Sequence, residues 1–358
     1  MRNILLNPGP VTLSDGVRGA LTRADLCHRE DEFATLQSGL REKLLRVYDL
    51  PADEWAAILL TGSGTAAVEA MLASCVPQDG RLLIIENGVY GERMQRIAEA
   101  YAMAHQSVRC AWIEAIELTE IRALLAGGNF SHVAVVHHET TTGRLNNLRA
   151  LGEICAMTNT RMLVDAVSSF GAESIDFSQW PIDACAATAN KCLHGVPGTA
   201  FVVARRNVFD QPHEKPRSVY LNLAEYLAKQ DAGGTPFTQS VQTFYALDEA
   251  LNEFFAAGGV IARQRLFQGR MAQIRTALER LGVVGLLPVQ DCSCVLQAFE
   301  LPEGMAYDNL HDQMKRRGFI IYAGQGSLAV SAFRISAMGD INTGDMNRLL
   351  DALQEILA

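Results

Sequence analysis

The stretch Leu60-Thr61-Gly62-Ser63-Gly64-Thr65-Ala66-Ala67 leads from an apolar run through two glycines into small and apolar residues. We interpret it as a strand, a tight turn and the start of a helix. Glycines let the backbone approach a phosphate closely, and free N–H groups at a helix start can donate to its oxygens. Ser63 and Thr65 would add hydroxyl groups. By itself the segment also fits a dinucleotide-binding turn with Glu86 on the ribose, or a capped helix without a ligand.

Around this stretch, from about residue 57 to residue 204, short apolar runs alternate with longer amphipathic stretches. The alternation is typical of an α/β sheet, in which buried and largely parallel strands are joined by helices on both faces. Ligand sites in such sheets lie at the carboxyl ends of the strands. We expect strands at residues 57–60, 81–86, 132–137, 161–165, 184–189 and 199–204, with helices at 65–74, 91–103 and 148–158.

A turn-rich break, Gly233-Gly234-Thr235-Pro236, precedes the last third of the chain. The pattern from 241 to 281 predicts a long helix interrupted near Gly258-Gly259. Strands are expected at 294–299, 319–322 and 328–333, before a closing helix from Thr343. We therefore predict a large domain and a smaller α+β domain. The expected boundaries are 1–17 for an amino-terminal arm that packs with the small domain, 18–250 for the large domain and 251–358 for the small domain.

The composition is that of an ordinary globular protein, with 49% hydrophobic and 20% charged residues among 358. Forty acidic side chains against 31 basic ones give a net charge of −9, which disfavours nucleic acid as a partner. No apolar run reaches the length of a membrane span, and the first residues do not resemble a signal peptide, so we expect a cytoplasmic protein without a membrane partner. The eight cysteines and the adjacent His137 and His138 lack metal-site spacing, and no metal is expected.

Three more expected strand ends carry side chains that suit a planar cofactor. Tyr90 lies between two glycines and could stack on a ring. Thr140 offers a hydroxyl group, and Asp165 ends an apolar strand, where a carboxylate can pair with a protonated pyridine nitrogen. Each residue also has an ordinary interpretation, as a loop aromatic, a turn residue and a helix N-cap.

Lys191 follows the next expected strand, between small or apolar neighbours and a turn. A lysine kept from bulk water favours its neutral amine, the form that attacks an aldehyde to make a Schiff base. Each of these elements is ambiguous alone. Their order along one α/β domain, which is phosphate-binding turn, aromatic, hydroxyl, Asp and Lys, supplies every part that a pyridoxal 5'-phosphate (PLP) site needs.

The chain resembles the class V aminotransferases of PLP fold type I and, within them, the 2-aminoethylphosphonate:pyruvate aminotransferases. The resemblance runs from about residue 4 to the end. The motifs that carry it are Asn7-Pro8-Gly9-Pro10, Leu26-Cys27-His28-Arg29-Glu30, Thr61 to Thr65, Asn87 to Arg93, His138 to Gly143, Val164 to Ser169 and Ala189 to Gly198.

The resemblance implies a role for each matching residue. Lys191 would be the Schiff-base lysine and proton carrier, and Asp165 the partner of the pyridine nitrogen. Arg334 would bind the acidic group of an amino donor or of a 2-oxo acid acceptor. The other expected contacts are Tyr90 on the ring, Thr140 near its phenolic oxygen, Ser63, Gly64 and Thr65 on the phosphate, and Thr238 on the phosphate of the second subunit in a homodimer with shared active sites.

The implied reaction moves the amino group of 2-aminoethylphosphonate to pyruvate, giving phosphonoacetaldehyde and L-alanine in phosphonate degradation. The sequence departs from the family where Ala323-Gly324-Gln325 replaces an expected Pro-Gly-Lys, and where Ser336-Ala337 replaces an expected glycine. These departures leave the amino donor open, with alanine or serine and glyoxylate as the alternative pair. Other rival functions are a nicotinamide-dependent dehydrogenase, a catalytically silent PLP-fold binding module and a desulfurase.

Overall fold

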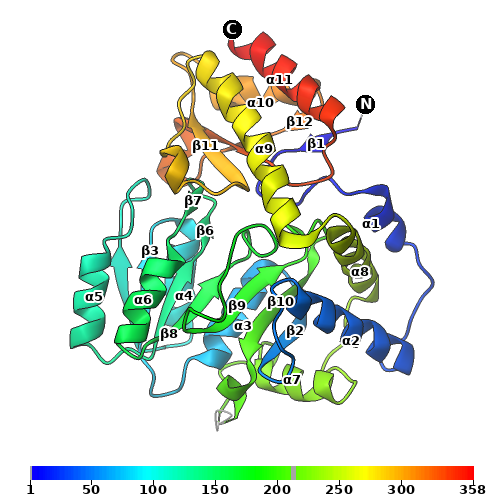
Figure 1. Cartoon of the computed structure of the whole chain (residues 1–358), viewed down its shortest axis with the longest axis vertical. Helices are drawn as coiled ribbons and strands as arrows, with labels where there is room; N and C mark the ends of the chain where they lie inside the picture. Colours follow the sequence, from blue (N-terminus) through cyan, green and yellow to red (C-terminus); the bar gives the residue numbers. More distant parts are fainter. Residues whose placement is uncertain (1, 211–214) are drawn as a thin grey trace.

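A seven-stranded sheet forms the centre of the computed structural model, which describes residues 2–210 and 215–358 (Figure 1). Neighbouring strands are parallel except at β10, which runs antiparallel to both β2 and β9. The predicted α/β fold with a mostly parallel sheet is therefore confirmed. In sheet order the strands are β2 (Trp55–Gly62), β10 (Gly198–Arg205), β9 (Ile182–Thr188), β8 (Arg161–Asp165), β5 (His132–Val136), β3 (Leu82–Glu86) and β4 (His105–Arg109).

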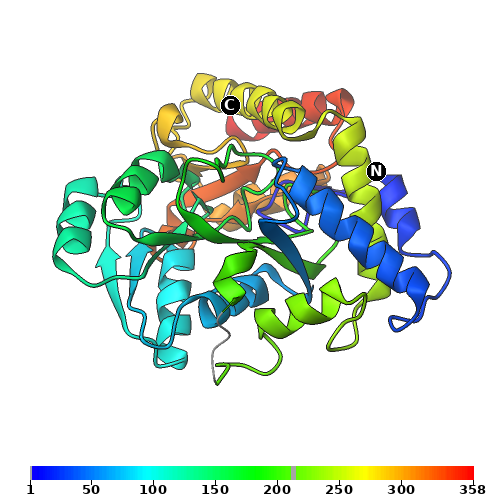
Figure 2. The ribbon, with the colours of Figure 1, turned by 60° about the horizontal axis from the view of Figure 1, so that its bottom comes forward.

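Helices cover both faces of this sheet because successive strand residues point to opposite sides. Leu59 packs with one layer of helices, and its neighbours Ile58 and Leu60 pack with the other. In Figure 2 the second layer lies toward the bottom. The first layer comprises α2 (Asp31–Arg46), α5 (Leu118–Gly127), α6 (Leu148–Met157) and α8 (Val241–Ala256), and the second comprises α3 (Gly64–Cys75), α4 (Val89–Ala100) and α7 (Leu223–Asp231).

A smaller antiparallel sheet and three helices follow the central sheet in the chain and lie at the top of Figure 1. The start of the chain joins them, since β1 pairs in parallel with β12 and Leu6 lies in the same apolar core as Phe319. The elements are β1 (Ile4–Leu5), β11 (Leu296–Glu300), β12 (Phe319–Ile320), β13 (Tyr322–Ala323), β14 (Ala332–Ser336), α9 (Gly259–Arg280), α10 (Tyr307–Arg316) and α11 (Thr343–Leu357).

Shorter elements complete the chain. The helix α1 precedes α2, and the hairpin β6–β7 follows β5. Their bounds are α1 (Asp15–Ala20), β6 (His138–Glu139) and β7 (Arg144–Leu145), with 3-10 turns at Arg206–Phe209, Val289–Asp291 and Gly326–Val330. In the described part of the chain, no helix combines the length and the apolar character that crossing a membrane requires.

Most expected elements are present. The predicted break near Gly258-Gly259 is confirmed, because α8 ends before these glycines, α9 begins at Gly259, and both glycines have positive φ angles. The prediction of a strand that begins at residue 328 is wrong. Residues Gly326–Val330 form a 3-10 turn, and the strand β14 begins only at Ala332. The apolar residues of this run do not all enter a core, since the Val330 side chain is 86% exposed.

Candidate active site

The glycine turn after β2 is the segment predicted to bind an anion, and we call it the anion-binding turn. Ser63 is the N-cap of α3, and its hydroxyl group makes no capping hydrogen bond. A Cβ atom at Gly64 would lie 2.7 Å from the Cγ1 atom of Val167, so only glycine fits there without displacing its neighbour. The N–H groups of Gly64 and Thr65 stand in the first turn of α3, where no acceptor within the helix is available. These donors and the Ser63 hydroxyl can hold an anion.

Arg93 adds a positive charge beside this turn, and its role was not predicted from the sequence. Its Nη1 atom donates a hydrogen bond of 3.0 Å to the Thr65 hydroxyl oxygen. Its guanidinium carbon lies 4.7 Å from the centre of the Tyr90 ring. Tyr90 and Arg93 share the first turns of α4, so this helix connects the predicted stacking residue to the predicted phosphate turn.

Asp165 ends β8 in the middle of the sheet and is buried. One carboxylate oxygen accepts a 2.9 Å hydrogen bond from the N–H of Val167. Burial raises the pKa of Asp165 to about 6, against an ordinary 3.8, although Arg93 and Lys191 act in the opposite direction. Within the described residues, no cationic side chain forms an ion pair with it. A cationic ring nitrogen would supply the missing partner and restore the charged form.

Lys191 follows β9, the strand next to β8, and its charge interacts with that of Asp165. Burial lowers the pKa of Lys191 to about 8, which favours the neutral amine. The start of the chain covers the side chain: Nζ donates a hydrogen bond to the carbonyl oxygen of Pro8. A Cβ atom at Gly9 would lie 2.7 Å from Cδ of Lys191. The amino-terminal segment therefore forms one wall around the predicted nucleophile.

Glu139 is a buried carboxyl group that ties two predicted site residues together. It accepts hydrogen bonds from the hydroxyl and N–H groups of Thr141, at 2.6 and 3.1 Å, and from the N–H of Tyr90, at 3.2 Å. Burial raises the pKa of Glu139 to about 7. Because Thr140 lies between Glu139 and Thr141, these bonds fix its position relative to the Tyr90 ring.

Arg334 lies on β14 and is only 3% exposed. Its Nε atom donates to the carbonyl oxygen of Ala323 at 2.9 Å, and Nη1 donates to the carbonyl oxygen of Thr140 at 2.9 Å. Its charge also acts on Lys191. The structure thus brings Arg334 to Thr140 and Lys191, although these residues lie far apart in the sequence. A guanidinium held this way can bind an acidic group beside a reactive amine.

Comparison with known proteins decides which family this arrangement represents. The family model described as "Aminotransferase class-V" matches residues 15–341. The chain belongs to the class V aminotransferase family. The membership expected from the sequence motifs is confirmed, and so is the prediction of an aminotransferase.

Full-length relatives of this class V aminotransferase share one name. A 2-aminoethylphosphonate–pyruvate transaminase from Lysinibacillus sphaericus is 33% identical over 99% of this chain and 97% of its own length. One from Vibrio cholerae is 34% identical over 99% of this chain and 97% of its own length.

Solved structures agree on the fold. Aspartate aminotransferase from Thermus thermophilus superposes with a TM-score of 0.90 at 27% identity, covering 99% of this chain and 100% of its own. Alanine–glyoxylate aminotransferase from Nostoc sp. superposes with a TM-score of 0.93 at 24% identity, covering 100% of this chain and 96% of its own. At that lower identity the likeness concerns the fold alone. The predicted PLP-transferase fold is confirmed.

One predicted site residue stands apart from the others in the class V aminotransferase. Thr238 is exposed, in the segment between α7 and α8. Its neighbour Gln239 accepts a 2.8 Å hydrogen bond from the hydroxyl group of Thr61, just before the anion-binding turn. The exposed hydroxyl of Thr238 is therefore available to a second copy of the chain, and its predicted contact across a dimer stays a prediction.

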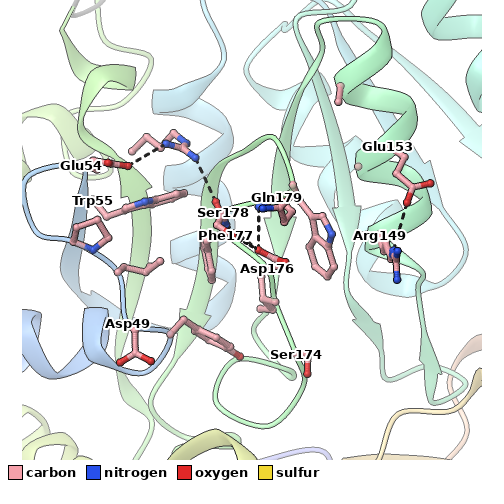
Figure 3. Close-up of a pocket in the computed structure, with 18 residues that line it drawn as sticks. Asp49, Glu54, Trp55, Arg149, Glu153, Ser174, Asp176, Phe177, Ser178 and Gln179 are labelled. Atoms are coloured by element: carbon pink, nitrogen blue, oxygen red, sulfur yellow. Dashed lines mark hydrogen bonds and ion pairs between the residues drawn. The ribbon is translucent and has the colours of Figure 1, made fainter.

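A hollow of about 1110 Å³ is lined by none of the predicted site residues (Figure 3). It lies near the start of β2 and the end of β10, whereas the anion-binding turn follows the carboxyl end of β2. Two pairs of its charged side chains lie close together, since Arg205 lies 3.7 Å from Glu54 and Arg149 lies 3.4 Å from Glu153. The predicted anion-binding turn lies at the opposite ends of these strands.

Proposed function

We propose that this class V aminotransferase uses PLP to transfer the amino group of 2-aminoethylphosphonate to pyruvate, giving phosphonoacetaldehyde and L-alanine. The name shared by full-length relatives supports the pair of substrates. The observation that carries the proposal is the buried pair of Asp165, at the end of β8, and Lys191, which follows the adjacent strand β9, with opposite pKa shifts. The carboxylate lacks a cationic partner and the amine loses its proton more easily than an ordinary lysine, which is the pair of groups that a pyridine aldehyde requires.

The residues present fit the cofactor. Gly64 lacks the Cβ atom that would fill the turn, the Ser63 hydroxyl has no capping role, and Arg93 brings a positive charge, so a phosphate group suits this end. Tyr90 would stack on the ring, and Thr140 would lie near its phenolic oxygen. Asp165 would pair with the ring nitrogen. When bound, PLP withdraws electrons from the carbon atom that carries the amino group of the donor.

The side chains of this chain supply binding and proton transfer. Arg334 would hold the acidic group of the donor and later that of pyruvate, so that both substrates present the reacting carbon to the same place. The Lys191 amine would take the proton from that carbon of the donor and return a proton in the second half-reaction. Pro8 and Gly9 cover the amine and exclude water from it.

The visible spectrum of the purified, PLP-loaded protein tests the proposal. We expect 2-aminoethylphosphonate to remove the aldehyde absorption and pyruvate to restore it, with formation of alanine. Alanine, serine and glyoxylate are the comparisons. If glyoxylate restores the absorption and pyruvate does not, the alternative substrate pair holds. A protein that is colourless with PLP and is stabilised by a nicotinamide cofactor would contradict the proposal.

A homodimer with shared active sites belongs to the same proposal. The exposed Thr238 and the exposed Tyr220 support it, because the Tyr220 hydroxyl donates a 2.9 Å hydrogen bond to the carbonyl oxygen of Thr61 beside the anion-binding turn. A second subunit that covers this surface would place its own Thr238 near the phosphate.

A further inference from the structure

The turn Gly324-Gln325-Gly326 carries one side chain into the region of Arg334. The N–H of Gly324 donates a 2.7 Å hydrogen bond to the carbonyl oxygen of Ala332, and a Cβ atom there would collide with the backbone of Leu328. Gly326 has a φ of +53°, and a Cβ atom would lie 2.5 Å from Cη2 of Trp112. Both flanking positions therefore require glycine, and the backbone that carries Gln325 is fixed on both sides.

The amide group of Gln325 has a defined orientation. Its Oε1 atom accepts a 3.1 Å hydrogen bond from Nη1 of Arg334 and lies 3.5 Å from the hydroxyl oxygen of Thr141. The Thr141 hydroxyl already donates its one hydrogen to Glu139, so Nη1 of Arg334 is the donor that orients this oxygen, and the NH₂ group of Gln325 faces away from it. No residue in the described ranges accepts a hydrogen bond from this Nε2 atom. The amide therefore has two donor hydrogens available.

Arg334 has one nitrogen left in the same place. Its Nε and Nη1 atoms donate to Ala323, Thr140 and Gln325, and no described residue accepts from Nη2. The free donors are thus Nη2 of Arg334, which is cationic, and Nε2 of Gln325, which is neutral. The charges with the largest effect on the pKa of Arg334 are those of Tyr90, Glu139, Tyr307 and Tyr322, and none of these side chains carries a positive charge.

We propose that Gln325 determines specificity, by forming with Arg334 a subsite of one positive charge that binds singly charged acid groups. A carboxylate or a singly ionised phosphonate matches one cationic and one neutral donor, whereas a doubly ionised phosphonate leaves one negative charge without a partner. This inference rests on the proposed function, in which the same subsite receives a phosphonate and a carboxylate in turn. It also explains how one subsite accepts both groups, since neither is favoured by a second cation.

The dissociation constants of acetate and methylphosphonate test the inference without turnover. They are measured by calorimetry on the PLP-loaded protein, at a pH where methylphosphonate is mostly doubly ionised. In Gln325→Lys we expect methylphosphonate to gain about tenfold in affinity relative to acetate, since a charge-assisted hydrogen bond replaces a neutral one. In Gln325→Leu both ligands weaken, by about fivefold to tenfold. In Gln325→Glu both weaken further, because the new carboxylate pairs with Arg334.

Ser327→Ala is the matched control, an exposed position in the same segment, and it should leave both constants unchanged. Equal shifts of the two ligands in Gln325→Lys, or unchanged binding in Gln325→Leu, overturn the inference. A variant that loses its PLP absorption has lost its fold. The dissociation constants of the remaining two variants then test the inference. A protein that never converts 2-aminoethylphosphonate, but whose Gln325 variants show the predicted order of dissociation constants, refutes the proposed function alone. A protein that converts 2-aminoethylphosphonate but does not show the predicted order of dissociation constants refutes the inference alone.

Discussion

Asp165 lowers the free energy of unfolding of the protein when no cofactor is bound. Its pKa of about 6 exceeds the ordinary 3.8, so the folded chain holds a proton that the unfolded chain releases between these two values. The free energy of unfolding therefore falls as the pH rises from about 4 to 6, and the loss persists at neutral pH. A difference of this size corresponds to on the order of 2–3 kcal/mol.

We predict that Asp165→Asn stabilises the PLP-free protein at pH 7 by on the order of 2 kcal/mol and abolishes turnover, because the amide carries no charge to bury. Denaturant unfolding at pH 5 and pH 7 measures the first effect. Asp183→Asn is the matched control on the neighbouring strand. There His132 and Arg161 lower the pKa of Asp183, so the same substitution should destabilise the protein. Destabilisation by both variants would contradict the account of Asp165.

Substitutions at Lys191 and at Arg334 should have separate effects, the first on the chemical step and the second on substrate binding. We predict that Lys191→Ala loses all turnover and no longer retains pyridoxyl after borohydride reduction, which peptide mass analysis detects. Arg334→Ala should keep the PLP absorption and mainly raise the substrate KM, by tenfold or more, since it loses a charged hydrogen bond. Lys229→Ala, an exposed lysine on α7, is the control for both. Normal turnover in Lys191→Ala would refute the mechanism.

Lys191 and Asp165 could be predicted from the sequence, because each follows a short apolar run that indicates a buried strand. Pro8 was not predictable as a contact of Lys191, because 183 positions separate them and only the tertiary fold brings them together. The same holds for the contact between Arg93 and Thr65. Arg93 follows Tyr90 by three positions, about one helical turn, which is the local signal that could have identified it.

At the scale of elements, the start of α3 depends on close packing against the segment after β8. We predict that Gly64→Ala weakens PLP binding by about tenfold, because the new methyl group displaces the helix start from Val167. Titration of the PLP-free protein with PLP measures the effect, and Val167→Ala in the same chain should restore part of the affinity. The control is Gly39→Ala, within α2 and with no atom nearby, which should stabilise by about 0.5–1 kcal/mol.

Strands with a buried apolar pattern were predicted well, whereas several other elements were not, and two of them show why. The strand β4, His105 to Arg109, forms one edge of the sheet and is largely polar, so no apolar run marks it. The stretch from Leu328 to Val330 is apolar but forms a 3-10 turn, because Gly324 and Gly326 redirect the backbone against Leu328 and Trp112. In both cases tertiary packing overrode the local pattern.

At the scale of the whole molecule, active sites shared between two subunits predict that two inactive variants restore activity when they form a mixed dimer. Lys191→Ala and Thr238→Glu should each be inactive, the second because its carboxylate repels the phosphate held by the partner. A mixture refolded together should recover about a quarter of the wild-type rate per chain, because half of the dimers are mixed and each has one intact site. Rate measurements before and after mixing provide the test. A mixture that stays inactive would show that Thr238 serves its own subunit, and an active Thr238→Glu variant would show that it serves no site.

The pairing of β1 with β12 has a consequence for synthesis on the ribosome. Ile4 and Leu5 emerge from the ribosome long before their partners, Phe319 and Ile320. Such a distant pairing forms late and slowly. Until it forms, the wall of Pro8 and Gly9 over Lys191 is missing, so a nascent chain can build its central sheet before it can shelter the amine from water. Capture of the coenzyme in its final enclosed form should therefore wait until β12 has been synthesised and has paired with β1.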